Sequence, residues 1–294
     1  MSLRDLLLGL TVVLLWGFNI VTAKWGVAEV PPLLFTALRF AAVGLLVVPF
    51  VRLPRAALRD ILLLSLTFGT GGFGLMFMSF SIAEGSTAAI VSQLVVPFSV
   101  LLGIFVLKER PGPRRIFGIV LALAGVVVVA GEPQATPPLG IILMAGSAAC
   151  SALGNLFLKR LTQLPPLGVV GWMSLFATPQ LVVLSLLLET NQVEAVLAAS
   201  ERVWWSLGYT VLAASIIAHS LWAGLVRRHE LSRIVPFALL APITSVVCAI
   251  LFLGEPLTLL KIIGGGITLT GVAIIQIRQA KKAPQTAADP ARAA

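Results

Sequence analysis

Several polar side chains fall inside long apolar stretches of this sequence, where water is absent. Asn19 lies two residues after Gly17 and Asn155 directly after Gly154, and each precedes a basic residue by five positions, Lys24 and Arg160 respectively. An amide in hydrocarbon must find a hydrogen-bond partner, because an unpaired polar group there is costly. Two interpretations stay open: the amides join neighbouring helices, or they face a central cavity and bind a solute.

Three ionisable side chains also interrupt apolar stretches. Arg39 either snorkels to the nearer interface or pairs with a solute carboxylate or phosphate in a water-filled cavity. Lys24 either anchors its helix at the interface or assists Arg39 from the same side. His219 is either a neutral, hydrogen-bonded core residue or a cavity hydrogen-bonder and proton site. These side chains predict a binding site and no chemical reaction.

Other residues complete this inventory. Gln93 is a further amide, Trp16 and Trp222 are candidate cavity walls, and Pro97 and Pro242 leave backbone carbonyls without their usual donors. Four glycines, Gly69, Gly71, Gly72 and Gly74, indicate close helix packing.

Carboxylates are absent from the middle of the apolar stretches. Every Asp and Glu lies at the end of such a stretch, in a loop or in the tail. A proton-coupled exporter of lipophilic cations usually needs a buried carboxylate, so this class is disfavoured and an anionic or zwitterionic solute is favoured. A membrane-embedded enzyme is also disfavoured, because the chain lacks HExxH and has only two His. Cys150 and Cys248 lack metal-ligand spacing, so we expect neither a metal nor a cofactor.

Composition requires a membrane around these residues. The chain is 58% apolar and 11% charged, with a mean hydropathy of +1.02, against roughly 45–50% and about 25% in soluble domains. The net charge of +9 comes from basic residues scattered singly or in short groups, so nucleic acid is not an expected partner. Charged and proline-rich breaks predict an all-α protein with ten spans, at 5–24, 32–51, 58–80, 86–107, 114–131, 138–159, 167–188, 203–226, 232–253 and 257–277.

The chain contains a long internal repeat. Glu109, Gly118 and Gly125 recur as Glu255, Gly264 and Gly271, each shifted by 146 positions (255 − 109 = 146). An odd number of spans in each copy turns the second copy over, so we expect a 5+5 inverted-topology repeat. The predicted units are 1–135, 136–278 and a disordered tail, 279–294. Parity places Glu109 and Glu255 on opposite faces, where each is expected to pair locally or to cap its own helix.

Basic residues predict the orientation. With both termini in the cytoplasm, seventeen of the twenty-one Lys and Arg fall in cytoplasmic segments, whereas the opposite loops carry mainly Glu. We therefore expect a multi-pass protein of a bacterial-type inner membrane, with lipid and a small solute as partners and a monomer as the unit.

These residues resemble those of the drug/metabolite transporter superfamily, in particular its EamA family of ten-helix exporters. The resemblance covers both halves and is carried by Trp16-Gly-x-Asn19 with Lys24, Pro31-Pro32, Leu38-Arg39-Phe40, Lys108-Glu109-Arg110, Trp222, Pro236, Pro242 and Gly254-Glu255. The spacing from Trp16 to Phe40 is similar to that of the EamA exporters of O-acetylserine and cysteine. His219 is a departure, since those proteins tend to carry an aromatic residue there.

The resemblance implies export of cysteine, O-acetylserine or other neutral amino acids by alternating access, through facilitated diffusion or exchange. The expected solute-binding residues are Trp16, Asn19, Arg39, Gln93, Asn155, His219 and Trp222, and the expected structural or gating residues are Lys24, Pro97, Pro242, Glu109 and Glu255. The alternative is a proton-coupled multidrug or small-molecule efflux transporter.

Overall fold

Ten long apolar helical spans make up this protein in a computed structural model that describes residues 1–108, 111–132, 136–229 and 231–282. Within these ranges all regular structure is helical. The ten predicted spans are confirmed, with shifts of a few residues at their ends. Pro32, Pro113, Pro138 and Pro166 begin four of the helices, at the first helical position, where a missing N–H costs nothing.

The first half contains five spans. The first span is α1 (Leu3–Val27), and the second is α2 (Pro32–Val47), extended by η1 (Val48–Phe50). The third span consists of η2 (Arg55–Ala57), α3 (Leu58–Leu64), η3 (Ser65–Gly74) and α4 (Leu75–Ile82). The fourth consists of α5 (Gly85–Ser92) and α6 (Val95–Leu107), and the fifth is α7 (Pro113–Ala130). The fourth span is interrupted between α5 and α6. Pro97 lies in the first turn of α6, and the Gln93 carbonyl that it leaves free accepts the Val96 N–H at 3.1 Å.

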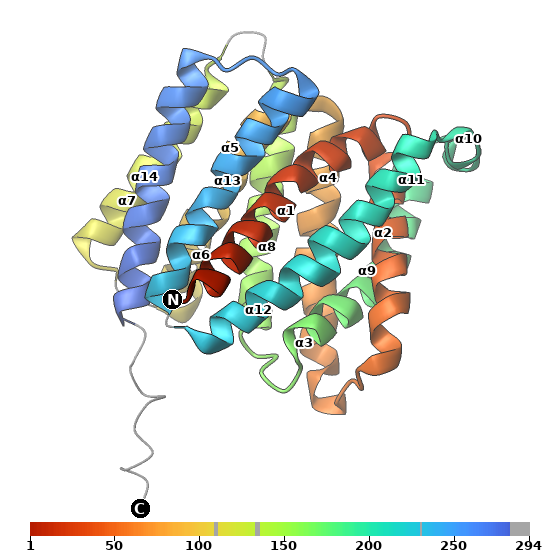
Figure 1. The fold of residues 1–294 in the computed structure, drawn as a ribbon, viewed down its shortest axis with the longest axis horizontal. Coiled ribbons are helices and arrows are strands. Elements are labelled where there is room, and N and C mark those ends of the chain that lie inside the picture. The colour runs from red at the N-terminus through yellow and green to blue at the C-terminus, as the bar shows by residue number, and fades with distance from the viewer. Residues whose placement is uncertain (109–110, 133–135, 230, 283–294) are drawn as a thin grey trace, which may run out of the picture.

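The second half repeats this plan. Its elements are α8 (Pro138–Leu158), α9 (Pro166–Leu188), the short helix α10 (Gln192–Ala198), an eighth span of α11 (Glu201–Gly208), η4 (Tyr209–Ile217) and α12 (Ala218–Arg228), then α13 (Leu231–Leu253) and α14 (Leu259–Lys282). Helix α14 continues four residues beyond the predicted boundary at 278, and residues 283–294 lie outside the described part. In Figure 1, α1 begins and α14 ends at the same end of the bundle.

Helix partners in the two halves correspond. Helix α1 packs against α13, and its counterpart α8 packs against α5 and α6, while α2 pairs with α9 and α7 with α14 (Figure 1). The third and eighth spans both contain a π-helix, η3 and η4. This exchange of partners supports the interpretation of the chain as two inverted copies.

The repeated glycines meet where α7 crosses α14. A Cβ atom on Gly118 would lie 2.9 Å from the Gly271 carbonyl oxygen, and one on Gly125 would lie 2.5 Å from that of Gly264. Only glycine permits this approach of two backbones. Gly118 of the first copy meets Gly271 of the second, and Gly125 meets Gly264. A twofold axis that relates the two halves would therefore pass between α7 and α14.

The glycine-rich part of η3 packs closely on α8 and α9. A Cβ atom on Gly72 would lie 2.6 Å from the Ser151 hydroxyl, and one on Gly69 would lie 2.8 Å from the Ala177 side chain. The Ser147 hydroxyl also donates to the Gly72 carbonyl at 2.6 Å. These contacts agree with the packing role expected for the stripe.

Candidate functional site

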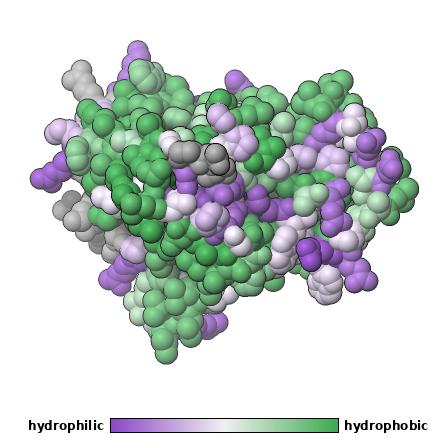
Figure 2. Space-filling model, turned by 90° about the horizontal axis from the view of Figure 1, so that it is seen from above, coloured by the Kyte–Doolittle hydropathy of each residue, from purple (hydrophilic) through white to green (hydrophobic). Residues whose placement is uncertain are grey.

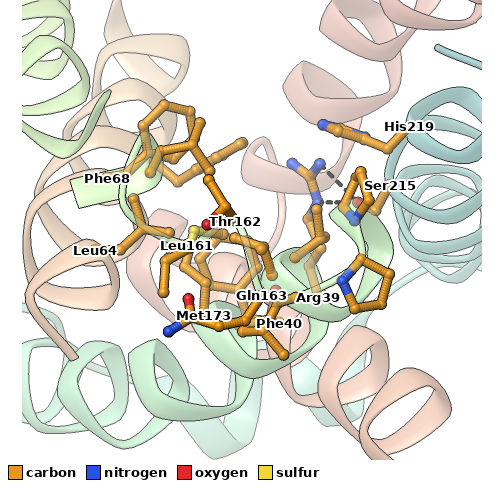
Figure 3. A pocket seen from close by; sticks show the side chains of 18 of the residues that line it. Arg39, Phe40, Leu64, Phe68, Leu161, Thr162, Gln163, Met173, Ser215 and His219 are labelled. Atoms are coloured by element: carbon orange, nitrogen blue, oxygen red, sulfur yellow. Dashed lines mark hydrogen bonds between the residues drawn. The ribbon is translucent and has the colours of Figure 1, made fainter. Parts of the chain in front are cut away.

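A cavity of about 730 Å³ lies between the two halves (Figure 3). Helices α2, α3, α9 and α12, with η3 and η4, contribute to its wall, and the segment that joins α8 to α9 lies at its mouth. Thr162 and Gln163 at the mouth are exposed, whereas Arg39 at the opposite end is only 3% exposed. The cavity therefore opens at the end of the bundle that carries residues 159–165, and Arg39 lies deep inside.

Arg39 does not reach the surface, so it does not snorkel. Its Nε and Nη2 atoms donate to the Ser215 hydroxyl oxygen at 3.3 and 2.9 Å, as the dashed lines in Figure 3 show. Its guanidinium carbon lies 5.0 Å from the centre of the Phe73 ring and 5.5 Å from that of Phe77. Its Nη1 atom is buried and has no hydrogen-bond partner within the described residues. Aromatic rings thus surround a cation that keeps donor capacity for an anion.

The π-helix η4 positions the partner of Arg39. The Ser215 hydroxyl donates to the Thr210 carbonyl, five residues earlier, at 2.7 Å. This bond directs the Ser215 oxygen lone pairs toward the guanidinium. The His219 ring nitrogen Nδ1 lies 3.0 Å from the Ala214 carbonyl, again five residues earlier. The wide turn thus brings Ser215 and His219 to the same cavity wall (Figure 3).

Trp16 links His219 to a second cavity. Its indole N–H donates to the Ala214 carbonyl at 3.2 Å, and its ring lies 5.3 Å from the His219 ring and 5.4 Å from the Trp222 ring. Trp16 also lines a cavity of about 170 Å³ with Asn19, Gln93 and Pro242. The Trp16–His219 pair therefore lies between the small cavity and the large one.

The small cavity contains an amide with unused capacity. The Asn19 side-chain oxygen is buried without a hydrogen-bond partner in the described part of the chain. Within the described ranges, Gln93 donates a single long hydrogen bond, 3.5 Å, to the Ser92 hydroxyl. Neither amide lines the cavity of Arg39.

Asn155 lies apart from both groups. It lines a third cavity, of about 330 Å³, with Ser99, Arg115, Lys159 and Gln276. Its amide nitrogen donates to the Ser99 hydroxyl at 3.5 Å. The seven predicted solute-binding residues thus divide among three regions, and of these only Arg39 and His219 line the large cavity.

Of the predicted gating residues, Lys24 and Glu255 lie at the end of the bundle opposite the cavity mouth, whereas Pro97 lies in the first turn of α6 and Pro242 lines the small cavity. Lys24 donates to the carbonyl oxygens of Phe80 and Ala83, at the end of α4, so it ties two spans together. Viewed from this end, hydrophilic side chains gather across the middle and hydrophobic ones form the rim (Figure 2). Glu109 lies outside the described residues.

Glu255 closes the same end from the second half. It accepts hydrogen bonds from the Gly85 and Ser86 N–H groups at 2.6 and 2.8 Å and from the Ser86 hydroxyl at 2.6 Å. It therefore caps α5 of the other half, and the prediction that it would pair locally or cap its own helix is wrong. Lys261 joins the same two halves through an ion pair with Glu84 at 2.6 Å.

Sequence reasoning missed several cavity residues. Ser215 and Ser174 are isolated hydroxyls in apolar helices, and Phe73 and Phe77 look like ordinary core residues. No short-range pattern distinguishes them, because they meet Arg39 or its cavity only through contacts between spans. Among the described residues no group of three His, Cys, Asp or Glu is placed to hold a metal ion.

Comparison with known proteins matches the whole span-forming part of the chain. The sequence matches the EamA-like transporter family over residues 3–131 and 138–277. It is 32% identical to the "Probable amino-acid metabolite efflux pump" of Salmonella typhimurium and to that of Escherichia coli K12, covering 93% of this chain and 95% of each relative. A crystal structure of another protein is similar in fold, with a TM-score of 0.62 at 20% identity, over 97% of this chain and 100% of that one.

Proposed function

Because the chain belongs to the EamA-like transporter family, and is thus a membrane transporter and not an enzyme, we propose that it exports small amino-acid-type metabolites. Cysteine, O-acetylserine and other neutral amino acids are the solutes to test first, since the two relatives at 32% identity are named amino-acid metabolite efflux pumps. The proposal rests on the position of Arg39. It is a buried guanidinium that faces a cavity, with Nη1 left for a solute carboxylate.

Alternating access supplies the mechanism. The basic loops support a cytoplasmic position for the cavity mouth, and in this arrangement a solute enters from inside and its carboxylate meets Arg39. Three contacts hold the opposite end shut. Glu255 accepts hydrogen bonds from the start of α5, Lys24 donates to the end of α4, and Glu84 pairs with Lys261. Opening that end while the mouth closes moves the solute across. The lining of the cavity lacks a carboxylate within the described residues, which favours facilitated diffusion or exchange over proton coupling.

Within this mechanism the two remaining groups have different roles. Trp16, His219 and Trp222 form an aromatic partition between the large cavity and the small one. Asn19 and Gln93 would meet the solute only after this partition moves, in the state that is open to the other side. Asn155 would remain a packing residue in both states.

Transport by the purified protein tests the proposal. Proteoliposomes loaded with unlabelled solute should exchange labelled cysteine, O-acetylserine or leucine without a pH gradient. Liposomes prepared without protein are the control for leakage. If none of these solutes, nor any derivative of them, moves faster than in the control, the amino-acid proposal is wrong.

A further inference from the structure

The large cavity has an uneven balance of charge. Its ionisable lining residues are Arg39, His219 and Arg227, and no Asp or Glu lines it among the described residues. The carboxylate of Asp60, on α3, is already paired with Arg160 at 3.7 Å. Glu255 and Glu84 are engaged at the other end of the bundle. The cavity can therefore neutralise an anion and offers no carboxylate to a cation.

The requirements of a free amino acid differ from what this lining provides. In a zwitterion the ammonium group lies on the carbon next to the carboxylate, so a carboxylate held by Arg39 brings the ammonium close to the same guanidinium. Two like charges repel in a site of low dielectric constant. The Ser215 hydroxyl is already committed to Arg39 and to the Thr210 carbonyl, so it is not a ready acceptor.

Two acceptors in this region are buried without a partner among the described residues: the Ser174 hydroxyl lines the large cavity, and the Asn19 amide oxygen belongs to the other one. The Asn19 side-chain oxygen lines the small cavity, beyond the Trp16–His219 pair. A free ammonium group would thus lose water on entering the large cavity and would find there the neutral Ser174 hydroxyl in place of a carboxylate, which is unfavourable.

The remaining wall suits an uncharged, apolar body. Aromatic and aliphatic side chains line the space between Arg39 and the mouth, namely Phe40, Leu64, Phe68, Phe73, Leu164 and Met173. Figure 3 shows Phe40, Leu64, Phe68 and Met173 in this wall. Burying an apolar group against them is favourable.

We propose that the preferred solute of this cavity is a carboxylate whose body is apolar and carries no charged amine, such as an N-acylated amino acid. The inference rests on the proposed function and narrows it: the exported metabolite is the form of the amino acid in which the amino group is blocked. Arg39 binds the carboxylate, and the rings and aliphatic side chains bind the acyl and side-chain groups.

Three compounds that share the leucine side chain and differ in charge test this inference in proteoliposomes. N-acetylleucine is an anion, leucine is a zwitterion and leucinamide is a cation. We expect N-acetylleucine to reach half-maximal transport at a concentration at least about tenfold lower than leucine, and leucinamide to remain at the level of protein-free liposomes. A tenfold difference corresponds to about 1.4 kcal/mol in binding, the scale of one charge-assisted hydrogen bond.

Two outcomes overturn the inference in distinguishable ways. If leucine is transported as well as N-acetylleucine, or better, the inference fails and the proposed amino-acid export stands. If neither compound moves, and cysteine and O-acetylserine do not move either, the proposed function fails with it.

Variants and a binding measurement check the role of Arg39 in the preference. Arg39→Ala should remove the preference for N-acetylleucine, whereas Arg59→Ala, at an exposed position outside the cavity, should retain it. N-acetylleucine should also raise the Tm of the wild-type protein in detergent more than leucine does, and this measurement requires no variant to fold. An equal shift for both compounds would contradict the inference.

Discussion

Arg39 combines a charge, a fork of donors and nearly complete burial, and its environment explains how the membrane interior tolerates it. Ser215 satisfies two guanidinium nitrogens, and the rings of Phe73 and Phe77 face the cation. Truncating the side chain should remove the site for a solute carboxylate. Replacing it by lysine should keep the charge and lose the fork.

At the scale of this residue we expect Arg39→Ala to reduce kcat/KM for the transported solute by about ten- to hundredfold, since a charge-assisted hydrogen bond contributes about 1.5–3 kcal/mol. Arg39→Lys should recover part of this loss. Initial rates of solute exchange in proteoliposomes measure both. Equal rates in wild type, Arg39→Ala and Arg39→Lys would show that Arg39 only supports the fold.

Sequence alone could identify Arg39 and His219 as members of a cavity, because charged or titratable side chains in apolar spans have few alternatives. It could not group them with Ser215, since that contact joins residues 176 positions apart. The sequence also led us to predict one solute site for Asn155 and Asn19, because the residues around them are alike. Such likeness reflects duplication and says nothing about which cavity each copy faces.

At the scale of elements, the two copies end the fourth and ninth spans with the same backbone conformation but with different residue types. Lys108 directly follows α6 and Gly254 directly follows α13. These are equivalent positions (254 − 108 = 146), and both adopt left-handed backbone, with φ of 54° and 70°. Glycine adopts this conformation without a steric penalty, whereas lysine does not.

Lys108→Gly should therefore stabilise the protein by up to about 1 kcal/mol, because left-handed backbone costs an L-residue roughly 1–2 kcal/mol and glycine loses about 0.5–1 kcal/mol more on folding. Gly254→Ala should destabilise it. Thermal unfolding in detergent, followed by circular dichroism, gives the direction of both changes. A lower Tm for Lys108→Gly would mean that the Lys108 side chain contributes more than its backbone strain costs.

The loop between α1 and α2 makes a pH-dependent contact with the start of α11. The Glu29 carboxylate accepts hydrogen bonds from the Ser200 N–H at 2.8 Å and from the Ser200 hydroxyl at 2.7 Å. These bonds lower the pKa of Glu29 below its ordinary value of 4.5. A carboxyl group whose pKa is depressed on folding stabilises the protein above its ordinary pKa, and this contribution is lost as the pH falls through the folded value.

The Tm of wild type should accordingly exceed that of Glu29→Gln at pH 7, and the difference should disappear at a pH below the lowered pKa of Glu29. Melting curves of the two proteins from neutral to acid pH measure this convergence. A difference that is independent of pH would assign the effect to packing of the side chain and not to its charge.

The ten spans could be predicted because length, hydropathy and proline positions act within each segment. The interruption of the fourth span and the π-helices η3 and η4 could not. Their hydrogen bonds depend on what packs against them, as where Ser147 of α8 donates to the Gly72 carbonyl of η3. The role of Glu255 was missed for the same reason: its partners, Gly85 and Ser86, belong to the other half.

At the scale of the whole molecule, one end is open and the other is closed by contacts between the halves. Thr162 lies at the open mouth, and Ala88, which is buried, lines the small cavity in α5, the helix that Glu255 caps. In a background with Cys150 and Cys248 replaced by serine, an impermeant thiol reagent should label Thr162→Cys from the cytoplasmic side only. It should label Ala88→Cys from the outside slowly.

Adding Glu255→Gln removes a charge-assisted cap that contributes about 0.5–2 kcal/mol, so the closed end should open more often and outside labelling of Ala88→Cys should accelerate by about two- to thirtyfold. Labelling of Thr162→Cys from the cytoplasmic side should fall only slightly, because both ends are not open at once in alternating access and the outward-open state is initially rare. Glu194→Gln, on the exposed helix α10, is the matched control and should change neither rate. If Glu255→Gln left both rates unchanged, the contacts of Glu255 would be part of the static fold and the gate would lie elsewhere.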